Sequence, residues 1–423
     1  MRKSIKSVAI LGGGPSGCSL AILLNRKKIK TAVFYIPKRP EIIVGESLVP
    51  AIIPYLKMLG VEDEIKSFST YKPGASVWLN QAEVFSSPFS KGGGSLPHYA
   101  YNVPRVDFDR AIFNLALKEG VKFFDTPAKI EKTGNGDELK LSNVTIEAID
   151  NYFDGQPDLI VDATGRSRTI ARLLDIPAIE GNRKDVALFS HLTHTEPIEP
   201  YNIHLHRLDK GWAWRIPLPG RTSVGIVINP KHLEPFGKTK EEQYENFLMQ
   251  DNEFRKFTVG FQRNVPVNQY NNYQLISEKM FGQNWVLTGD AGGFLDPIFS
   301  SGTYLAIKGA FRLAETISVG TEVAFKKYQK EQKWELKIWQ DLVDTWYNGR
   351  LFTLFKVGQD RMDTAFGRFI GPVMQKRLTR IFSGEAVYGA FSRWFLYFVT
   401  GSMIDLMKMG RLHNREKSEL EIK

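Results

Sequence analysis

The stretch that decides the fold of this chain is Ser7-Val8-Ala9-Ile10-Leu11-Gly12-Gly13-Gly14-Pro15-Ser16-Gly17. It begins as an apolar strand, turns at its glycines and continues into a helical pattern from Cys18 to Asn25. Residues 30–36 then return as a second strand. This order of strand, glycine turn, helix and strand predicts a βαβ unit, with which dinucleotide-binding lobes open.

Three glycines of the turn, Gly12, Gly14 and Gly17, have the spacing G-x-G-x-x-G. In that motif the first glycine permits a tight turn and the second lets the backbone approach a pyrophosphate, while the third lets helix and strand pack closely. The amino terminus of the helix adds positive potential. We therefore predict that these glycines bind a dinucleotide, although the motif alone is weak.

Three features further along the chain strengthen this prediction. Residues 162–165 read Asp-Ala-Thr-Gly, residues 285–290 form a buried strand that ends in Gly289 and Asp290, and Arg105 opens a helix. The set resembles the two-lobed FAD enzymes, which include aromatic hydroxylases, halogenases and isoprenoid reductases. The resemblance implies that Asp290 bonds the ribityl chain of FAD and that Arg105 lies against its phosphates or ribityl chain. The alternative is that these residues are purely structural.

Two further runs narrow the resemblance. Residues 211–217 read GWAWRIP and residues 294–302 read FLDPIFSSG. Because side chains alternate along a strand, Trp212 and Trp214 are expected on one face, where their indoles form a wall or simply fill a core. The runs resemble the GWxWxIP and FxxPxxSxG motifs of the flavin-dependent halogenases. The second motif adds Pro297 to the residues expected at the cofactor.

Residues 45–50, which read GESLVP, resemble the G-E-[ST]-x-x-P run that this family places near the isoalloxazine ring. The resemblance therefore puts Glu46 at the cofactor, whereas the plainer interpretation is an ordinary helix entry. It also implies that Lys72, which follows this run, is the catalytic lysine. A lysine acts best there when burial lowers its pKa, but a typical lysine of a basic chain is only solvated.

The family chemistry implies a halide site. Reduced FAD, oxygen and chloride or bromide give hypohalous acid, which the lysine relays to the substrate. The resemblance assigns to the tryptophan wall the separation of the substrate from the flavin. By resemblance the halide would lie against the backbone amides of Ser301 and Gly302, where a helix begins and N–H groups are free. The alternative is a serine-capped helix start without a ligand.

Three departures from the family pattern bear on substrate and cofactor. Tryptophan halogenases have a glutamate where this chain has Phe299, which argues for a phenolic, resorcinol-like or pyrrole-like substrate rather than free tryptophan. The family often has a second lysine where this chain has Ser76. The second strand ends at Tyr35 without the usual ribose-binding carboxylate, so we expect weaker FAD retention or another partner such as Glu41.

The composition is that of an ordinary soluble globular protein of 423 residues, with 43% hydrophobic and 24% charged residues. A single cysteine, Cys18, excludes an intrachain disulfide and a cysteine-based metal site, and suits a reducing cytoplasm. We expect no metal, and interpret His204 and His206 as structural or surface residues. The net charge of +10 fits a solvated surface, an acidic carrier protein or a peripheral membrane contact. No nucleic-acid module is visible.

We predict an α/β fold with a Rossmann-like FAD-binding lobe, an inserted substrate lobe built on an antiparallel sheet, and a mainly helical C-terminal region. The expected boundaries are 1–80, 100–185 and 272–320 for the FAD lobe, 81–99 and 186–271 for the substrate lobe, and 321–423 for the C-terminal region. We expect no signal peptide and no membrane span.

The predicted function is that of a two-component FAD-dependent halogenase. A partner flavin reductase supplies reduced FAD, and the substrate is an electron-rich aromatic, free or bound to an acyl carrier protein. One alternative is a monooxygenase or reductase of the same fold, and another is a non-catalytic flavoprotein associated with a membrane or carrier. A Lys72 side chain that faces solvent would exclude the halogenase. The oligomeric state is left open.

Overall fold

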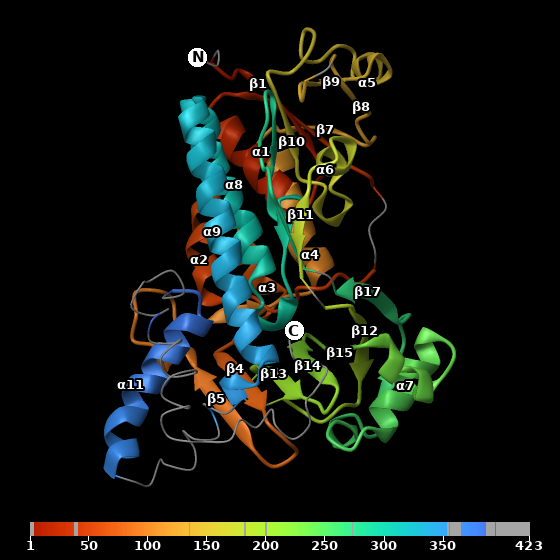
Figure 1. Cartoon of the computed structure of the whole chain (residues 1–423), viewed down its shortest axis with the longest axis vertical. Coiled ribbons are helices and arrows are strands. Elements are labelled where there is room, and N and C mark those ends of the chain that lie inside the picture. The colour runs from red at the N-terminus through yellow and green to blue at the C-terminus, as the bar shows by residue number, and fades with distance from the viewer. Residues whose placement is uncertain are drawn as a thin grey trace.

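The computed structural model describes residues 4–37, 41–134, 136–181, 183–198, 201–272, 274–352, 355, 365–385 and 394. Within them, a parallel sheet and a larger mixed sheet follow one another along the longest axis of the molecule (Figure 1). A long helix, α9 (Glu322–Tyr347), runs from the side of the parallel sheet toward the larger one (Figure 1). The predicted α/β class is confirmed.

The parallel sheet contains the predicted βαβ unit. Its described strands are five, in the order β19 (Trp285–Leu287), β10 (Leu159–Asp162), β1 (Ser7–Leu11), β2 (Lys30–Phe34) and β7 (Lys122–Phe124). All four pairings are parallel. The helix after the first strand, α1 (Pro15–Arg26), packs against α8 (Gly302–Val319) and α4 (Arg105–Lys118).

Two glycines of the first turn are required by packing. Gly12 has a φ of +112°, and a Cβ on it would overlap the carbonyl of Ala163. A Cβ on Gly17 would overlap the carbonyl oxygen of Gly12, so the helix could not lie as close to the strand. Gly14 differs, because a Cβ there would meet nothing within 4 Å. The turn therefore needs Gly12 and Gly17 for its own shape and leaves Gly14 open to a ligand.

The larger sheet has eight described strands. Seven follow in the order β16 (Gln262–Arg263), β12 (Asp185–Thr193), β15 (Arg221–Ile228), β14 (Gly211–Leu218), β13 (Ile203–Arg207), β4 (Gly74–Trp78) and β5 (Val84–Pro88), and β17 (Asn268–Asn272) also pairs with β12. All pairings are antiparallel except β13 with β4, which is parallel.

The expected lobe boundary at residue 80 is wrong at this point, because β4 lies in the larger sheet. Its partner β13 is more than a hundred residues away in sequence, and a local pattern carries no information about such a pairing. The rest of the division into lobes stays a prediction. The C-terminal region is represented by α9 and by α11 (Ala365–Phe382), and most of residues 386–423 lie outside the described residues.

The remaining elements are shorter and connect these layers. They are η1 (Pro50–Ile52), α2 (Ile53–Leu59), α3 (Glu62–Ser67), β3 (Thr70–Lys72), η2 (Phe89–Lys91), β6 (Ala100–Asn102), β8 (Ile130–Lys132), β9 (Leu139–Leu141), α5 (Asn143–Ala148), η3 (Gly165–Ser167), α6 (Thr169–Leu173), β11 (Ala178–Glu180), η4 (Pro230–His232), η5 (Glu234–Phe236), α7 (Lys240–Gln250), η6 (Arg255–Phe257), β18 (Leu275–Ser277), η7 (Gly289–Ala291), β20 (Gly293–Phe294) and η8 (Pro297–Phe299).

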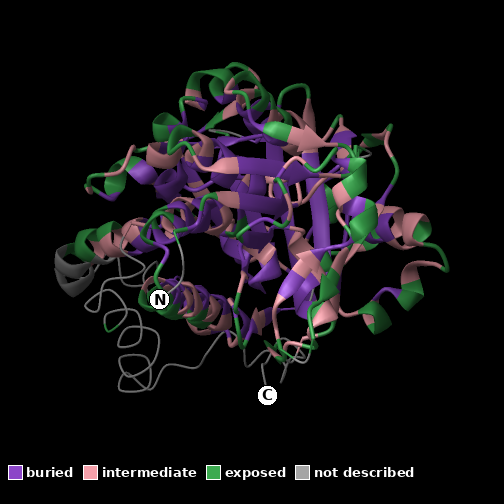
Figure 2. Cartoon of the chain, turned by 90° about the horizontal axis from the view of Figure 1, so that it is seen from above, coloured by how far each residue is buried: buried purple, intermediate pink, exposed green. Residues whose placement is uncertain are grey.

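Buried residues concentrate at the centre of the molecule, and the exposed ones lie at its rim (Figure 2). His204 and His206 are buried on one face of β13. Arg215 of β14 is the cross-strand partner of His204 and lies on the same face of the sheet. The described residues contain no cluster of three metal-ligating side chains.

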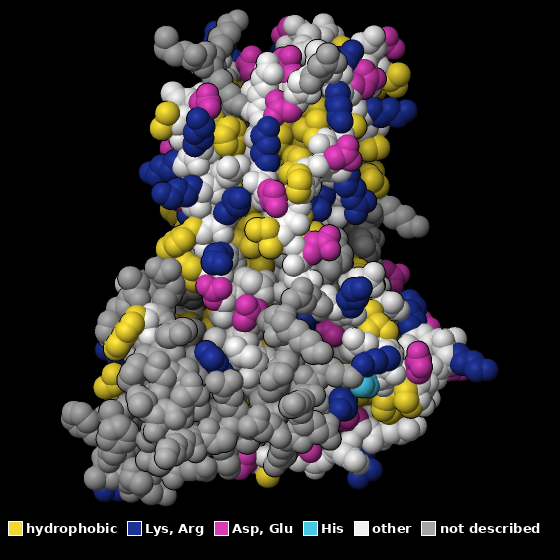
Figure 3. All heavy atoms as spheres, in the orientation of Figure 1, with side chains coloured by type: hydrophobic (Ala, Val, Ile, Leu, Met, Phe, Trp, Pro, Cys, Tyr) yellow, Lys and Arg dark blue, Asp and Glu magenta, His cyan; other side chains and the backbone are white. Residues whose placement is uncertain are grey.

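On one face of the molecule, Lys and Arg are interspersed with Asp and Glu over the parallel-sheet half (Figure 3). None of the helices in the described part of the chain is apolar enough over a sufficient length to cross a bilayer.

Candidate active site

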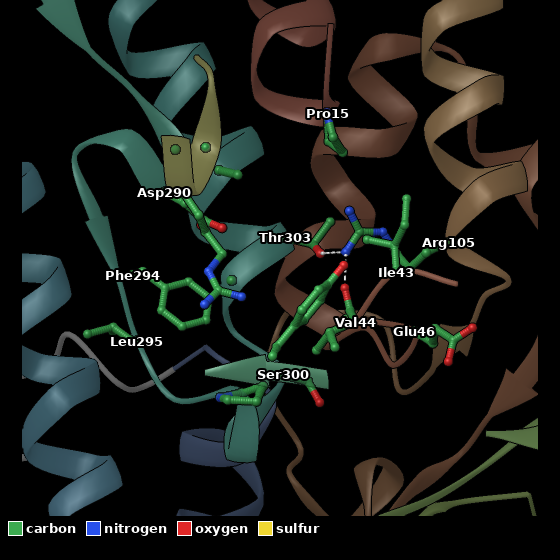
Figure 4. Close-up of a pocket in the computed structure, with 18 of the residues that line it drawn as sticks. Pro15, Ile43, Val44, Glu46, Arg105, Asp290, Phe294, Leu295, Ser300 and Thr303 are labelled. Atoms are coloured by element: carbon green, nitrogen blue, oxygen red, sulfur yellow. Dashed lines mark hydrogen bonds between the residues drawn. The ribbon is translucent and has the colours of Figure 1, made fainter. Parts of the chain in front are cut away.

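A cavity of about 600 Å³ lies between the first glycine turn and the face of the larger sheet. Its size is typical of a cofactor or ligand site. Figure 4 shows side chains from both halves of the chain converging on it. It brings together most of the predicted site residues, namely Gly14, Glu46, Arg105, Trp212, Trp214, Gly289, Asp290, Pro297 and Gly302.

One end of the cavity is formed by the amino terminus of α1. Gly14, Pro15 and Ser16 line it, and the first turn of this helix has no acidic residue. Free backbone N–H groups and the helix dipole therefore favour an anionic group here. Because Gly14 has open space where a side chain would stand, a pyrophosphate can approach the backbone. The residues present thus fit FAD.

Arg105 reaches the cavity from the first position of α4. Its Nη1 donates to the carbonyl oxygen of Val44 at 2.7 Å and to Oγ1 of Thr303 at 3.4 Å (Figure 4). Its Nε donates to Asp109, one helical turn further along α4, at 3.1 Å. These bonds hold a positive charge at the cavity, as expected for a residue that lies against FAD.

Asp290, the middle residue of the short η7 turn, lines the cavity. Burial raises the pKa of its carboxyl to about 6, and the positive charges of Arg105 and Arg166 act in the opposite direction. The carboxylate is therefore the dominant form at neutral pH and can accept a hydroxyl hydrogen bond. Sequence reasoning missed Arg166 and Thr303 as lining residues, because neither belongs to the motifs that were considered.

The two tryptophans of β14 form one continuous aromatic surface. Their ring centroids are 5.6 Å apart, both rings are buried, and both line the cavity. The Trp214 Nε1 donates to Oγ of Ser223 at 3.2 Å. Gly225 is the cross-strand partner of Trp214, and a Cβ on it would overlap the indole. The glycine therefore leaves the space in which this ring lies.

The segment before α8 forms a tight turn, here called the anion turn and defined as residues 296–302. Asp296 caps η8 by accepting from the backbone N–H of Ile298 at 3.0 Å, and Ser300 has a left-handed φ of 56°. Ser300 and Gly302 line the cavity, whereas Ser301 is buried and is not among its described lining residues. No acidic residue lies in the first turn of α8, so this helix start favours an anion.

Lys72 is buried beside this cavity rather than exposed to solvent. Its Nζ donates to Oγ of Ser47 at 2.8 Å and to the carbonyl oxygen of Leu48 at 2.7 Å. Burial lowers the pKa of the amine to about 7. The lysine lines a small apolar cavity of about 30 Å³. Three residues border both this cavity and the large one, Ile203, Leu205 and Ser300.

The sequence of the chain matches that of a known protein family. The sequence profile described as tryptophan halogenase matches residues 7–97 and 91–355. The chain belongs to the tryptophan halogenase family. This confirms the predicted resemblance to flavin-dependent halogenases, which use FAD with chloride or bromide.

Relatives of this halogenase-family chain include several named enzymes. A flavin-dependent halogenase (armH1) of Armillaria mellea is 28% identical over 347 residues, which cover 74% of the chain and 65% of that relative. The chain therefore spans slightly less than two thirds of that protein. A 1H-pyrrole-2-carbonyl-[peptidyl-carrier protein] chlorinase of Pseudomonas fluorescens is 26% identical over 392 residues, covering 82% of the chain and 85% of the relative.

Solved structures share the fold. The flavin-dependent brominase Bmp2 superimposes with a TM-score of 0.76 at 20% identity, covering 95% of this chain and 99% of that one. A flavoprotein/dehydrogenase from Cytophaga hutchinsonii gives a TM-score of 0.80 at 23% identity, covering 95% and 98% of the two chains. These identities support the fold of the halogenase-family chain and nothing finer.

The expected partner for the adenosine ribose does not appear at the cavity. Tyr35 packs with its ring against Phe113 and Phe123, at centroid distances of 5.1 and 5.8 Å. Glu41 is exposed, and neither residue is among the described lining residues. The structure therefore gives no support to Glu41 as a substitute for the missing carboxylate.

Proposed function

We propose that this protein is a two-component FAD-dependent halogenase that transfers chlorine or bromine through Lys72 to an electron-rich aromatic substrate. The observation that carries the proposal is the burial of Lys72 beside the flavin-sized cavity, with its amine pKa near 7. When bound, reduced FAD supplies hypohalous acid from oxygen and halide. The residues of the chain bind the cofactor, separate it from the substrate and relay the halogen.

The neutral amine of Lys72 is the form that reacts. Its nitrogen lone pair attacks the halogen of hypohalous acid, the N–halogen bond forms, the O–halogen bond breaks, and water leaves with the amine proton. The ring carbon of the substrate then takes the halogen, and the proton released by that carbon returns to the nitrogen. A pKa of about 7 provides a large fraction of neutral amine at neutral pH, which an exposed lysine does not.

The aromatic surroundings of Phe299 support a substrate whose own substituent stabilises the cationic ring intermediate. Phe299 stacks on Phe382 with centroids 5.7 Å apart and contacts Trp346 edge-on. This aromatic environment offers no carboxylate to a ring intermediate, unlike the glutamate that tryptophan halogenases have here. We therefore propose a phenolic, resorcinol-like or pyrrole-like ring. The pyrrole-carrier chlorinase among the relatives supports a carrier-bound form of it.

Two partners complete the proposal: a flavin reductase that supplies reduced FAD, and a carrier protein if the substrate is tethered. A cytoplasmic location stays a prediction. The rival monooxygenase has no use for a buried lysine beside the cavity, whereas halogen relay requires one. A non-catalytic flavoprotein would have no use for two helix starts, those of α1 and α8, that both favour an anion.

The deciding experiment measures products by mass spectrometry from purified protein, reduced FAD, oxygen, bromide, and monochlorodimedone or a panel of phenols. We expect brominated product from the wild type and the Lys66→Ala control, since Lys66 is an exposed lysine close in sequence. In Lys72→Ala we expect at least a hundredfold loss, with flavin oxidation to hydrogen peroxide retained. Hydroxylated product without bromine would establish the monooxygenase instead.

A further inference from the structure

Tyr347, the last residue of α9, joins two of the family motifs through its hydroxyl group. The Trp212 Nε1 of the tryptophan wall donates to the Tyr347 Oη at 2.6 Å. The same Oη donates to Oδ2 of Asp296, in the anion turn, at 2.7 Å. All three side chains are at most 1% exposed. A residue outside both motifs thus links the wall to the turn.

The direction of these bonds is fixed by chemistry. An indole N–H can only donate and a carboxylate can only accept, while a tyrosine hydroxyl does both at once. The bond to the carboxylate is charge-assisted and therefore stronger than a neutral one. Phenylalanine at position 347 would remove the acceptor of the Trp212 N–H and one donor to Oδ2 of Asp296, an oxygen that also lies 3.9 Å from Nη1 of Arg183. A buried group that loses its partner costs about 1–3 kcal/mol.

Asp296 connects the Tyr347 hydroxyl to the backbone of the anion turn. Its other oxygen, Oδ1, accepts from the Ile298 backbone N–H at 3.0 Å and so shapes the turn that leads to Ser300 and Gly302. Both of these residues line the large cavity. The carboxylate therefore holds the anion turn with one oxygen and Tyr347 with the other.

The neighbouring residue adds a packing contact to the same pair of motifs. The ring of Trp346 lies edge-on to Trp212 and to Phe299, with centroids 6.4 Å away in each case. The end of α9 thus touches both the wall and the turn, through a hydrogen-bonded residue and a packed one. The indole turns only about its χ1 and χ2 torsions, and a hydrogen bond at Nε1 adds a directional restraint on both to the contact with Trp346.

We propose that Tyr347 is a positioning residue that locks the Trp212 indole to the anion turn, so that the wall stays closed while hypohalous acid forms and passes to Lys72. This inference rests on the proposed halogenase function. It assigns a role to α9, a helix that lies outside both family motifs. Without the hydrogen bond from Trp212 to Tyr347, the Trp212 ring is less well fixed, and more of the oxidising equivalents are lost as hydrogen peroxide.

The test compares Tyr347→Phe with Tyr244→Phe. Tyr244 is also fully buried, and its hydroxyl donates to the Val224 carbonyl at 2.9 Å, in a core cluster that includes neither tryptophan of the wall. We expect both variants to lose thermal stability, and Tyr347→Phe to lose more, because the Tyr347 hydroxyl makes two hydrogen bonds, one of them to a carboxylate. In Tyr347→Phe alone, the ratio of brominated product to hydrogen peroxide should fall by about tenfold and the KM for bromide should rise. Both variants are compared at saturating FAD, because Trp212 lines the cavity that fits FAD.

A second readout needs no turnover. Iodide quenching of tryptophan fluorescence in the FAD-free protein should increase in Tyr347→Phe, and this increase should vanish when Trp212→Phe is added. If Tyr347→Phe fails to fold, Trp212→Phe alone tests the same bond, and it should lower the product ratio measured at saturating FAD.

The outcomes separate the two proposals. A product ratio in Tyr347→Phe equal to that of Tyr244→Phe, or unchanged iodide quenching, overturns the positioning role even if the enzyme halogenates. Absence of halogenated product from the wild type and Tyr244→Phe alike overturns the proposed function, and the quenching result then decides the lock between Tyr347 and Trp212 independently.

Discussion

The amine of Lys72 lies 2.8 Å from the hydroxyl oxygen of Ser47, and Ser47 also lines the large cavity. The lysine itself lines the small apolar cavity on the other side. Ser47 therefore connects the amine to the space that fits FAD. It belongs to the GESLVP run, so this run contributes an acceptor for the lysine as well as residues that line the large cavity.

Ser47→Ala should shift the pH dependence of halogenation. The hydroxyl accepts a hydrogen bond from the amine and so stabilises its charged form, which means that its removal lowers the Lys72 pKa further below about 7. Since the neutral amine is the reactive form, the rise of kcat with pH should move down by about one pH unit. Bromination rates measured across that range check this, and Ser47→Thr should retain the wild-type midpoint. An unmoved midpoint in Ser47→Ala would contradict the contact.

Lys72→Met should stabilise the FAD-free protein most at low pH. The pKa of this amine falls from its ordinary value of 10.5 to about 7 on folding, so between these values the unfolded chain binds more protons and wild-type stability rises with pH. Below about pH 7 the folded wild type carries the full cost of a buried ammonium, a few kcal/mol, which methionine avoids. Urea unfolding of both proteins at several pH values measures the difference. A difference that does not change with pH would show that the amine is solvated.

Gly17→Ala and Gly14→Ala should fail in different ways. A Cβ on Gly17 overlaps the Gly12 carbonyl oxygen, so we expect a stability loss of about 3 kcal/mol or more in the FAD-free protein. A Cβ on Gly14 meets no protein atom within 4 Å and should leave that stability nearly unchanged. It should instead weaken FAD binding by about tenfold or more, because it occupies the approach of the pyrophosphate. Thermal melting and flavin titration give the two values; normal FAD binding by Gly14→Ala would place the cofactor elsewhere.

Gly225→Ala should push Trp214 out of its place in the wall. The added methyl group overlaps the indole, which costs about 1–3 kcal/mol and displaces the ring toward the cavity. FAD affinity should fall as a result. In the double variant with Trp214→Phe, much of the stability loss should be recovered, because the smaller ring leaves room for the methyl group. Simple additivity of the two stability changes would mean that the residues do not interact.

The parts of the fold that were predicted correctly are those that local patterns determine. The helix expected to begin at Ser301 and Gly302 is α8, which begins at Gly302 and ends before Gly320, whose φ is left-handed. The strands at 7–11 and 211–217 are likewise β1 and β14, the latter one residue longer. Each of these signals lies within the element itself.

The features that were missed depend on contacts between distant parts of the chain. Tyr347 and Trp212 are 135 positions apart, and Ser47 and Lys72 are 25 apart. A tyrosine near the end of an amphipathic helix carries no mark of the partner that its hydroxyl will find. The burial of Lys72 was expected only through the family resemblance, since a typical lysine of a basic chain is solvated.

The small cavity beside Lys72 limits the size of the group that can reach the amine. Its volume of about 30 Å³ accommodates roughly two water-sized groups, which suits hypohalous acid. A benzene ring needs a cavity on the order of 150 Å³, and the side chains of Leu351 and Phe382 border the space where such a ring would have to lie. If Lys72 relays halogen as proposed, hypohalous acid fits this cavity as it is, whereas an aromatic ring needs Leu351 and Phe382 to move.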